Sequence, residues 1–348
     1  MESNNKTIAK NTIFLYFRMM MTIVVSLYTS RVVLKILGVD DFGLYQSVGG
    51  VVGLLSFLNA ALATGSSRFL TYELGRGDFI KLKKTFSTIV TAHLILAAGI
   101  VLLLETIGLW FVYNKLVIPI DRFDAAVVAF HLSILTAVFH LIQVPYTATI
   151  ISHEKMGIYA YVGIVDIVLR LAIVYLLNIG GIDKLILYSF LMGLVSLIMA
   201  LFYCICCVKI FDETKTELIL DKAILKDVLG YSIWNLFANS ALALKNQGSI
   251  ILLNMFFSPA VVTARTIANQ ANMAAFHLTT NFRTAATPQI VKRYAVNDYE
   301  GSKKLLFKII IKNLVNLNVF YQKGQPFGAI RQNWVLTCYL HTDMDCYL

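Results

Sequence analysis

Eight charged residues interrupt the long apolar runs of this chain, and they are the side chains best placed for chemistry. A charge within such a run costs several kcal/mol unless it faces protein, another charge or water. The six cations are Arg18, Arg31, Lys35, Arg170, Lys245 and Arg265, and the two acids are Glu105 and Asp166. This cationic surplus predicts a site for an anion. Phosphate is the natural candidate, because arginine offers two parallel hydrogen bonds and lysine a compact charge.

Lys245 is the most informative of these cations. It lies about 14 residues into a polar-striped run, too deep for its side chain to reach the membrane surface. Asparagines share a helical face in this run and in the next one, so we expect both stripes to line a cationic cavity. Such amides can instead join neighbouring helices, and this alternative stays open. The predicted lining is Arg18, Lys245 and Arg265, with Asn235, Asn239, Asn269 and Asn272.

The remaining charges admit two interpretations each. Asp166 and Arg170 are four residues apart, which places them on one helical face and predicts an ion pair within the helix. The alternative for that pair is a role in coupling. Arg31 and Lys35 are either further cavity cations or anchors at the membrane interface.

Composition places the chain among integral membrane proteins. Of its 348 residues, 58% are hydrophobic and 14% are charged, and the mean hydropathy is +0.71. About 20 apolar residues suffice to cross roughly 30 Å of hydrocarbon. The runs predict an all-α membrane bundle of about eight spans, at residues 12–37, 42–64, 86–113, 124–146, 157–179, 185–208, 231–257 and 260–281. The first run is too long for a cleaved signal peptide.

The distribution of lysine and arginine predicts the orientation of these spans. With a cytoplasmic N-terminus, eighteen of these residues fall in inside segments and three in outside loops. Cytoplasmic loops of membrane proteins carry such an excess. We therefore expect a multi-pass protein with its N-terminus in the cytoplasm.

Two charged stretches indicate an internal repeat. GDFIKLKK at 77–84 coincides with NDYEGSKK at 297–304 when the chain is shifted on itself by 220 residues. The shift also places the first span on the seventh and the second on the eighth, which predicts parallel six-helix repeats. The counterpart of the third span, residues 306–333, is too polar to cross lipid. These observations suggest a truncated or frameshifted chain with an N-terminal lobe at 1–208, a cytoplasmic linker at 209–230, two helices and a loop of a second lobe at 231–307, and an atypical polar tail at 308–348.

Motifs for catalysis and for cofactors are missing from the sequence. We find no nucleophile elbow, no paired catalytic carboxylates and no metal-ligand spacing around the five cysteines. No aromatic-interleaved basic patch points to nucleic acid. We therefore expect a protein that is not an enzyme, needs no cofactor or metal, and does not bind nucleic acid.

Two stretches resemble the Wzx-like polysaccharide-biosynthesis flippases of the MOP (MATE-like) exporter superfamily. The first, residues 11–78, begins NTIFLYFRMM and ends TYELGRGD, and the second, residues 268–307, begins ANQANMAAFH. The similarity covers roughly residues 11–307. It implies two six-helix lobes around a central cationic cavity, with Arg18, Lys245 and Arg265 where the lobes face each other.

The resemblance also implies a function. Members of this family move undecaprenyl-pyrophosphate-linked oligosaccharides across the bacterial inner membrane by alternating access. The expected partners are an anionic lipid-linked oligosaccharide of the O-antigen, capsule or exopolysaccharide type, membrane lipids, and a polysaccharide polymerase with other assembly proteins. Two alternatives remain: a cation-coupled multidrug exporter of the same superfamily, which would rely on buried acids, and a truncated product that does not transport.

Overall fold

The computed structural model describes residues 2–177, 181, 183–215 and 219–305. Within these ranges, side chains are described except at residues 2–12, 229, 232, 234, 238, 242 and 270–286. The predicted polar tail at 308–348 lies outside the described residues.

Every regular element in the described part of the chain is a helix, and these residues contain no strand. The helices are α1 (Glu2–Leu37), α2 (Val39–Gly53), α3 (Ser56–Arg76), α4 (Phe79–Leu103), α5 (Leu109–Lys115), α6 (Phe123–Ser152), α7 (Met156–Leu176), α8 (Lys184–Ile210), α9 (Lys222–Ala243), α10 (Ser249–Phe256) and α11 (Pro259–Ala295). Two π-helical turns, Leu104–Gly108 and Leu244–Gly248, join α4 to α5 and α9 to α10. Short 3-10 turns lie at Ile120–Arg122 and Asp212–Thr214.

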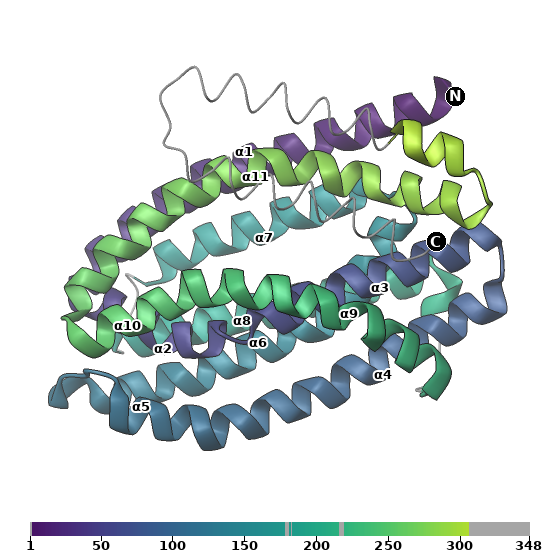
Figure 1. Ribbon diagram of the computed structural model, residues 1–348. Helices are drawn as coiled ribbons and strands as arrows, with labels where there is room; N and C mark the ends of the chain where they lie inside the picture. Colours follow the sequence, from purple (N-terminus) through teal and green to yellow (C-terminus); the bar gives the residue numbers. More distant parts are fainter. Residues whose placement is uncertain (1, 178–180, 182, 216–218, 306–348) are drawn as a thin grey trace.

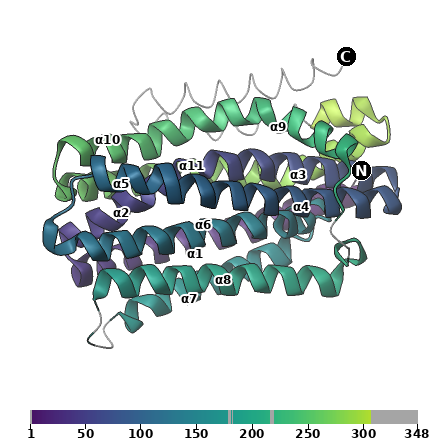
Figure 2. The ribbon, with the colours of Figure 1, turned by 90° about the horizontal axis from the view of Figure 1, so that it is seen from below.

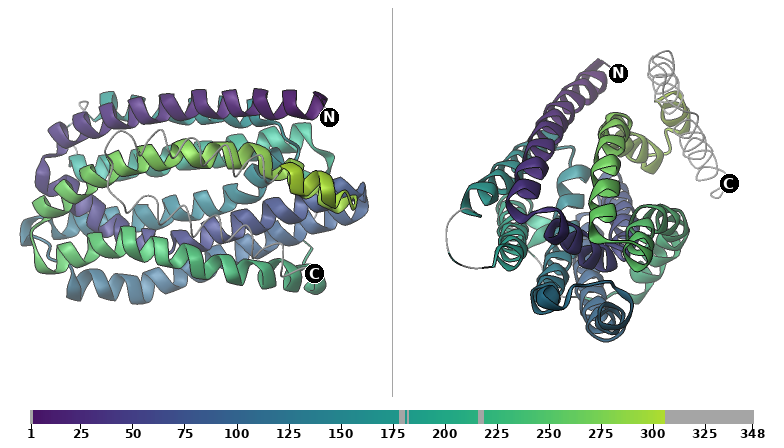
Figure 3. Two further views of the ribbon diagram at one scale, coloured as in Figure 1. Left: turned by 45° about the horizontal axis from the view of Figure 1, so that its top comes forward. Right: turned by 90° about the vertical axis from the view of Figure 1, so that its left-hand side faces the viewer.

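The helices run side by side along one direction as a bundle (Figures 1 and 2). Helix α6 packs against α3, α4 and α8, and α1 packs against α7 and α11. The end-on view places α9 and α11 on one side and α7 and α8 on the other (Figure 3). We call the end with the α1–α2 junction and the turn at Ile120–Arg122 the Arg122 end. The opposite end, with the α3–α4 and α6–α7 junctions, is the Glu154 end.

Five helical segments are long and apolar enough to cross a membrane: Ile13–Leu37, Phe79–Lys115, Ile120–Ser152, Met156–Leu176 and Lys184–Ile210. The pair α2 and α3 makes a sixth if it is counted as one span. The chain is therefore a multi-pass membrane protein with an all-α fold. The predicted spans at 231–257 and 260–281 are helical, but α9–α10 and α11 are not among these segments, and the count of about eight stays a prediction.

The second predicted span is not one straight helix. The structure breaks it between α2 and α3, with a bend of 50° at Leu54 and Leu55. The third and seventh spans contain the two π-helical turns. A continuous apolar run predicts a helix, but it does not reveal where tertiary packing interrupts the hydrogen bonds between backbone groups. Helix α9 also begins at Lys222, within the stretch 209–230 that was predicted as a linker.

The repeated charged stretches have the same turn geometry. Gly77 ends α3 in a left-handed conformation with φ at 75°, and the Asp78 side chain then accepts the Lys81 backbone N–H at 2.9 Å. Asn297 is also left-handed, with φ at 62°, and Asp298 accepts the Gly301 N–H at 2.9 Å. In both stretches a left-handed residue stops one helix and an aspartate caps the next.

Candidate functional site

Arg18 packs against α7. Its guanidinium carbon lies 4.2 Å from the centroid of the Tyr159 ring, a cation–π arrangement. Gly163 provides the space, because a Cβ atom there would lie far inside contact distance of Arg18 Cδ. The Arg18 Nε atom is buried without a hydrogen-bond partner. This cation therefore lies in the interface of α1 and α7.

Asp166 and Arg170 form an ion pair on α7. Arg170 Nε donates to both carboxylate oxygens of Asp166, at 3.0 Å each. The Nη1 atom of Arg170 lies 3.8 Å from the Met192 sulfur on α8. His140 of α6 is within electrostatic reach of both charges. Asp166, one of the two acids within the predicted spans, is thus engaged by an arginine on its own helix; the other, Glu105, contacts His131 of α6 at 3.0 Å.

Lys245 and Arg265 lie on the later helices and are both exposed. Lys245 is part of the π-helical turn Leu244–Gly248, and Arg265 lies in the second turn of α11. Neither has a carboxylate within ion-pair distance among the described residues. No described contact joins them to Arg18. Of the three cations predicted to line a cavity, Arg18 packs between α1 and α7. Lys245 and Arg265 lie exposed on the surface of α9–α11.

The predicted amide stripes also differ in their partners. Asn235, which is 8% exposed, donates to the Tyr231 carbonyl at 3.4 Å. Asn239 donates to the Asn235 carbonyl at 2.8 Å. Both amides therefore bond to the backbone of their own helix. Asn269 is half-buried on α11, and Asn272 lies on the same helix with its side chain outside the described set.

Arg31 and Lys35 are exposed side chains near the Arg122 end of α1. The part of the chain that the structure describes offers no carboxylate within ion-pair distance of either. Both earlier interpretations, cavity cation and interface anchor, agree with this position. They stay predictions.

A cavity of about 250 Å³ lies between α2, α3, α4 and α6. Its polar lining includes Asn59, Ser133, Thr136 and His140, and its apolar lining includes Ile100. Asn59 Oδ1 is buried with no hydrogen-bond partner. Sequence reasoning missed this cavity, because it depends on the bend between α2 and α3. The described residues hold no group of three or more His, Cys, Asp or Glu side chains suited to a metal ion.

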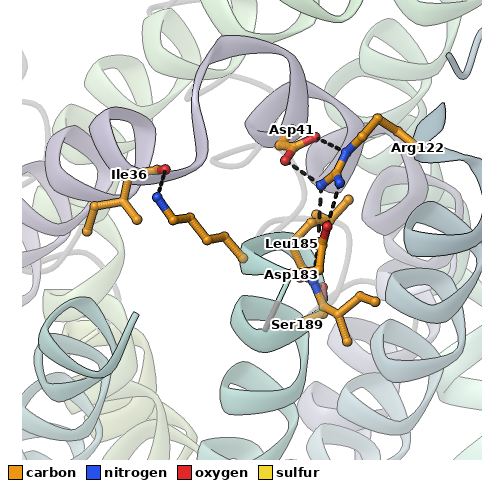
Figure 4. A network of polar contacts seen from close by, with 8 residues as sticks. Ile36, Asp41, Arg122, Asp183, Leu185 and Ser189 are labelled. Carbon is orange, nitrogen blue, oxygen red and sulfur yellow. Dashed lines mark hydrogen bonds and ion pairs between the residues drawn. The ribbon is translucent and has the colours of Figure 1, made fainter. Parts of the chain in front are cut away.

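A second feature missed from sequence is an ion cluster at the Arg122 end (Figure 4). Arg122 Nε donates to Asp41 Oδ1 at 2.8 Å, and Nη2 donates to Asp183 Oδ1 at 3.2 Å. Asp183 also caps α8 by accepting the Leu185 and Ile186 N–H groups. The hydrogen bond from Arg122 holds the pKa of Asp183 below its usual range. The cluster ties the starts of α2, α6 and α8 together.

Helix α2 also forms the main contact with the later helices at this end. A Cβ atom on Gly43 would collide with the Pro259 backbone carbonyl at the start of α11. A Cβ on Gly53 would lie 3.1 Å from the Gln247 side chain of the π-helical turn. Thr263 Oγ1 donates to the Val39 carbonyl at 2.9 Å. Gly43 therefore lets the start of α11 approach α2 closely, and Gly53 does the same for the π-helical turn before α10.

Solved structures with the same arrangement of helices identify the fold. A MATE transporter in complex with Br-NRF is similar over 88% of this chain and 71% of its own, with a TM-score of 0.67 and 15% identity. An outward-facing multidrug resistance MATE transporter of the MOP superfamily is similar over 91% and 72%, with a TM-score of 0.68 and 14% identity. The chain has the fold of the MOP-superfamily transporters.

A third similar structure is a MOP superfamily transporter from Pyrococcus furiosus with a reversed polarity of its binding pocket. It matches over 88% of this chain and 68% of its own, with a TM-score of 0.67 and 14% identity. No protein-family profile and no curated protein sequence matches the chain. At these identities the likeness establishes the MOP-type fold alone.

Proposed function

We propose that the chain is part of a transporter that moves polyprenyl-pyrophosphate-linked oligosaccharides across the bacterial inner membrane, with its N-terminus in the cytoplasm. One observation carries this proposal. Asp166 is engaged by Arg170, whereas Lys245 and Arg265 have no carboxylate partner among the described residues. The unpaired charges of these two side chains are positive. A cargo with an anionic headgroup would neutralise them.

A pyrophosphate group suits these side chains. It offers several anionic oxygens, to which Arg265 can donate two parallel hydrogen bonds and Lys245 a single charged contact. Each such bond is stronger at membrane depth than in water, because few water molecules compete there. In a two-lobe transporter the cargo binds where the lobes face each other. The positions of both cations on α9–α11, beyond the first six spans, are consistent with that place.

A second candidate function is export of cationic drugs. Two of the similar structures are described as MATE transporters, one of them as a multidrug resistance transporter, and the chain has a largely apolar cavity beside His140. A cation-coupled exporter would need Asp166 free from Arg170. The Pyrococcus furiosus transporter with a pocket of reversed polarity indicates that this fold is not confined to one charge of cargo.

The experiment places the full chain in lipid vesicles with a fluorescent polyprenyl-pyrophosphate disaccharide. Transfer between leaflets is followed with a membrane-impermeant quencher. We expect Lys245→Ala and Arg265→Ala each to slow transfer about tenfold, as for the loss of one charged hydrogen bond. Lys215→Ala is the matched control, because Lys215 is exposed and pairs with Asp212 outside the spans.

Two outcomes would contradict the proposal. Transfer unchanged in both variants would remove the cationic site. Transfer unaffected by these variants but abolished by Asp166→Asn would favour the cation-coupled exporter.

A further inference from the structure

The turn between α6 and α7 is tied to the last turns of α11 at the Glu154 end. Lys292 Nζ donates to Glu154 Oε1 at 2.6 Å, and the Gln289 amide donates to the other carboxylate oxygen. Glu154 lies between α6 and α7, and both donors lie on α11. The contact therefore bridges the two parts of the molecule.

These side chains are largely withdrawn from water. The Glu154 side chain is 11% exposed, that of Lys292 is 31% exposed, and Gln289 is 8% exposed. Hydrogen bonds between charged groups in such surroundings are short and strong. Leaving the Glu154 carboxylate in place without its donors would be costly. The bridge therefore favours the arrangement in which α11 touches the α6–α7 turn.

Close packing next to the bridge restricts the same movement. A Cβ atom on Gly75 of α3 would lie 2.8 Å from the Ala295 Cβ and 3.3 Å from the Lys292 Cα. Only glycine permits this approach without displacement. Helix α3 and the α6–α7 turn thus both contact the end of α11. The space between Gly75 and Ala295 is too narrow for a bulky reagent to enter.

The backbone at Glu154 is adapted to this contact. Its φ is 59°, in the left-handed region that residues other than glycine, asparagine and aspartate seldom adopt. A neighbour in the turn, His153, is held separately, by Glu213 and by stacking on Phe211. The contacts of His153 therefore fix the position of the turn, and the turn places the Glu154 side chain against α11.

We propose that Glu154 is a latch residue whose bonds to Lys292 and Gln289 keep the path between the two lobes closed at this end. The role rests on the proposed transport function, since alternating access needs a closure that can be released. Charged groups suit a contact that must open, because water solvates each of them once they separate. Apolar side chains would gain no such interaction with water after separation. The opposite end, where Gly43 meets Pro259, has no such charged bridge between α2 and α11 among the described residues.

The test measures opening without any cargo. The five native cysteines of the full chain are replaced by alanine, Ala295→Cys is introduced beside Gly75, and its rate of reaction with a bulky maleimide is measured in detergent. Glu154→Asn removes the carboxylate while asparagine tolerates the left-handed backbone. We expect this variant to react about tenfold faster, as for the loss of one charged hydrogen bond.

Controls separate the latch from general loosening. Asp212→Asn removes an exposed carboxylate whose ion pair with Lys215 lies within one turn, and it should leave the reaction rate unchanged. Glu154→Gln retains the shape and one possible hydrogen bond, and it should give an intermediate rate. The melting temperature of each variant identifies any that fail to fold, in which case Lys292→Gln provides the same loss of charge from the other partner.

Equal reaction rates in the parent, Glu154→Asn and Lys292→Gln would overturn the latch. Because the readout needs no cargo, this result would leave the proposed substrate untouched. Conversely, loss of transfer in Lys245→Ala with normal latch behaviour would bear on the cargo site alone.

Discussion

The first six spans and the helices that follow them handle charge in different ways. Within the first six spans, Asp166 and Arg170 neutralise each other and Arg18 packs on Tyr159, whereas Arg31 and Lys35 near the end of α1 are exposed. On α9–α11, Lys245 and Arg265 are exposed and have no carboxylate partner in the described part of the chain. The contrast between the Asp166–Arg170 pair and the two exposed cations shows that charged side chains on these helices can serve two purposes. Paired charged side chains stabilise one arrangement of the helices, whereas unpaired charged side chains are available to bind a ligand of opposite charge.

The largest expected effect comes from breaking the pair in the first six spans. Asp166→Ala leaves Arg170 without its partner and should lower the free energy of unfolding by about 2–3 kcal/mol, with allowance for the partial exposure of both groups. Thermal unfolding in detergent, followed by tryptophan fluorescence, measures the change. The matched variant Lys245→Ala should cost less than about 0.5 kcal/mol, because that side chain is exposed and unpaired.

A double variant sharpens the same contrast. Asp166→Leu combined with Arg170→Met removes both charges and should recover most of the lost stability, as replacement of buried ion pairs by apolar groups often does. If Asp166→Ala unfolded at the same temperature as the parent, the pair would not be structural. The distinction between the two regions would then fail.

A smaller effect is expected where the two regions touch. Gly43→Ala places a methyl group against the Pro259 carbonyl, so α11 must move away from α2, and we expect a loss of about 2 kcal/mol. Gly49→Ala is the matched control on the same helix, because nothing lies within 4 Å of a Cβ atom there. Its stability should be unchanged or slightly raised. Equal melting temperatures for the two variants would argue against close packing of α11 on α2.

The smallest effect concerns the cluster at the Arg122 end. The pKa of Asp183 is lower in the folded chain than in the unfolded chain, so its contribution to stability is full above the unfolded pKa, near 4. It is lost as the pH falls through the folded value. Arg122→Gln should therefore lower stability by about 1 kcal/mol at pH 7 and have a diminishing effect as the pH approaches 3. Melting temperatures of the parent and the variant across this range test the sign, and a gap that widens in acid would contradict it.

Much of the fold could be predicted from sequence because it depends on local composition. Long apolar runs require helices in lipid, since every backbone polar group must be satisfied within the segment. The spacing of four residues between Asp166 and Arg170 likewise predicted their contact, because residues i and i+4 lie on the same face of a helix, about one turn apart. The aspartates at 78 and 298 were recognisable as a repeat, and their common role as helix caps explains it.

Other features depended on residues far apart in the chain. Arg122 meets Asp41 and Asp183, which are 81 and 61 residues away, and no local pattern records those pairings. Periodicity placed Arg18 on a face of its helix, but it could not tell whether α7 or the later helices would cover that face. The glycine at position 163, which receives the Arg18 side chain, resembles any other glycine of an apolar run.

The sequence by itself determined that the chain crosses a membrane several times as helices, that its apolar runs contain more cations than acids, and that Asp166 and Arg170 share a helical face. These properties follow from composition and from spacings of a few residues. Only the tertiary structure decided where helices bend, which neighbour receives Arg18, and that Glu154 and Arg122 join segments at opposite ends of the bundle. Those outcomes depend on which helix faces contact each other. The sequence of one helix shows its faces but not which neighbouring helix will cover each of them.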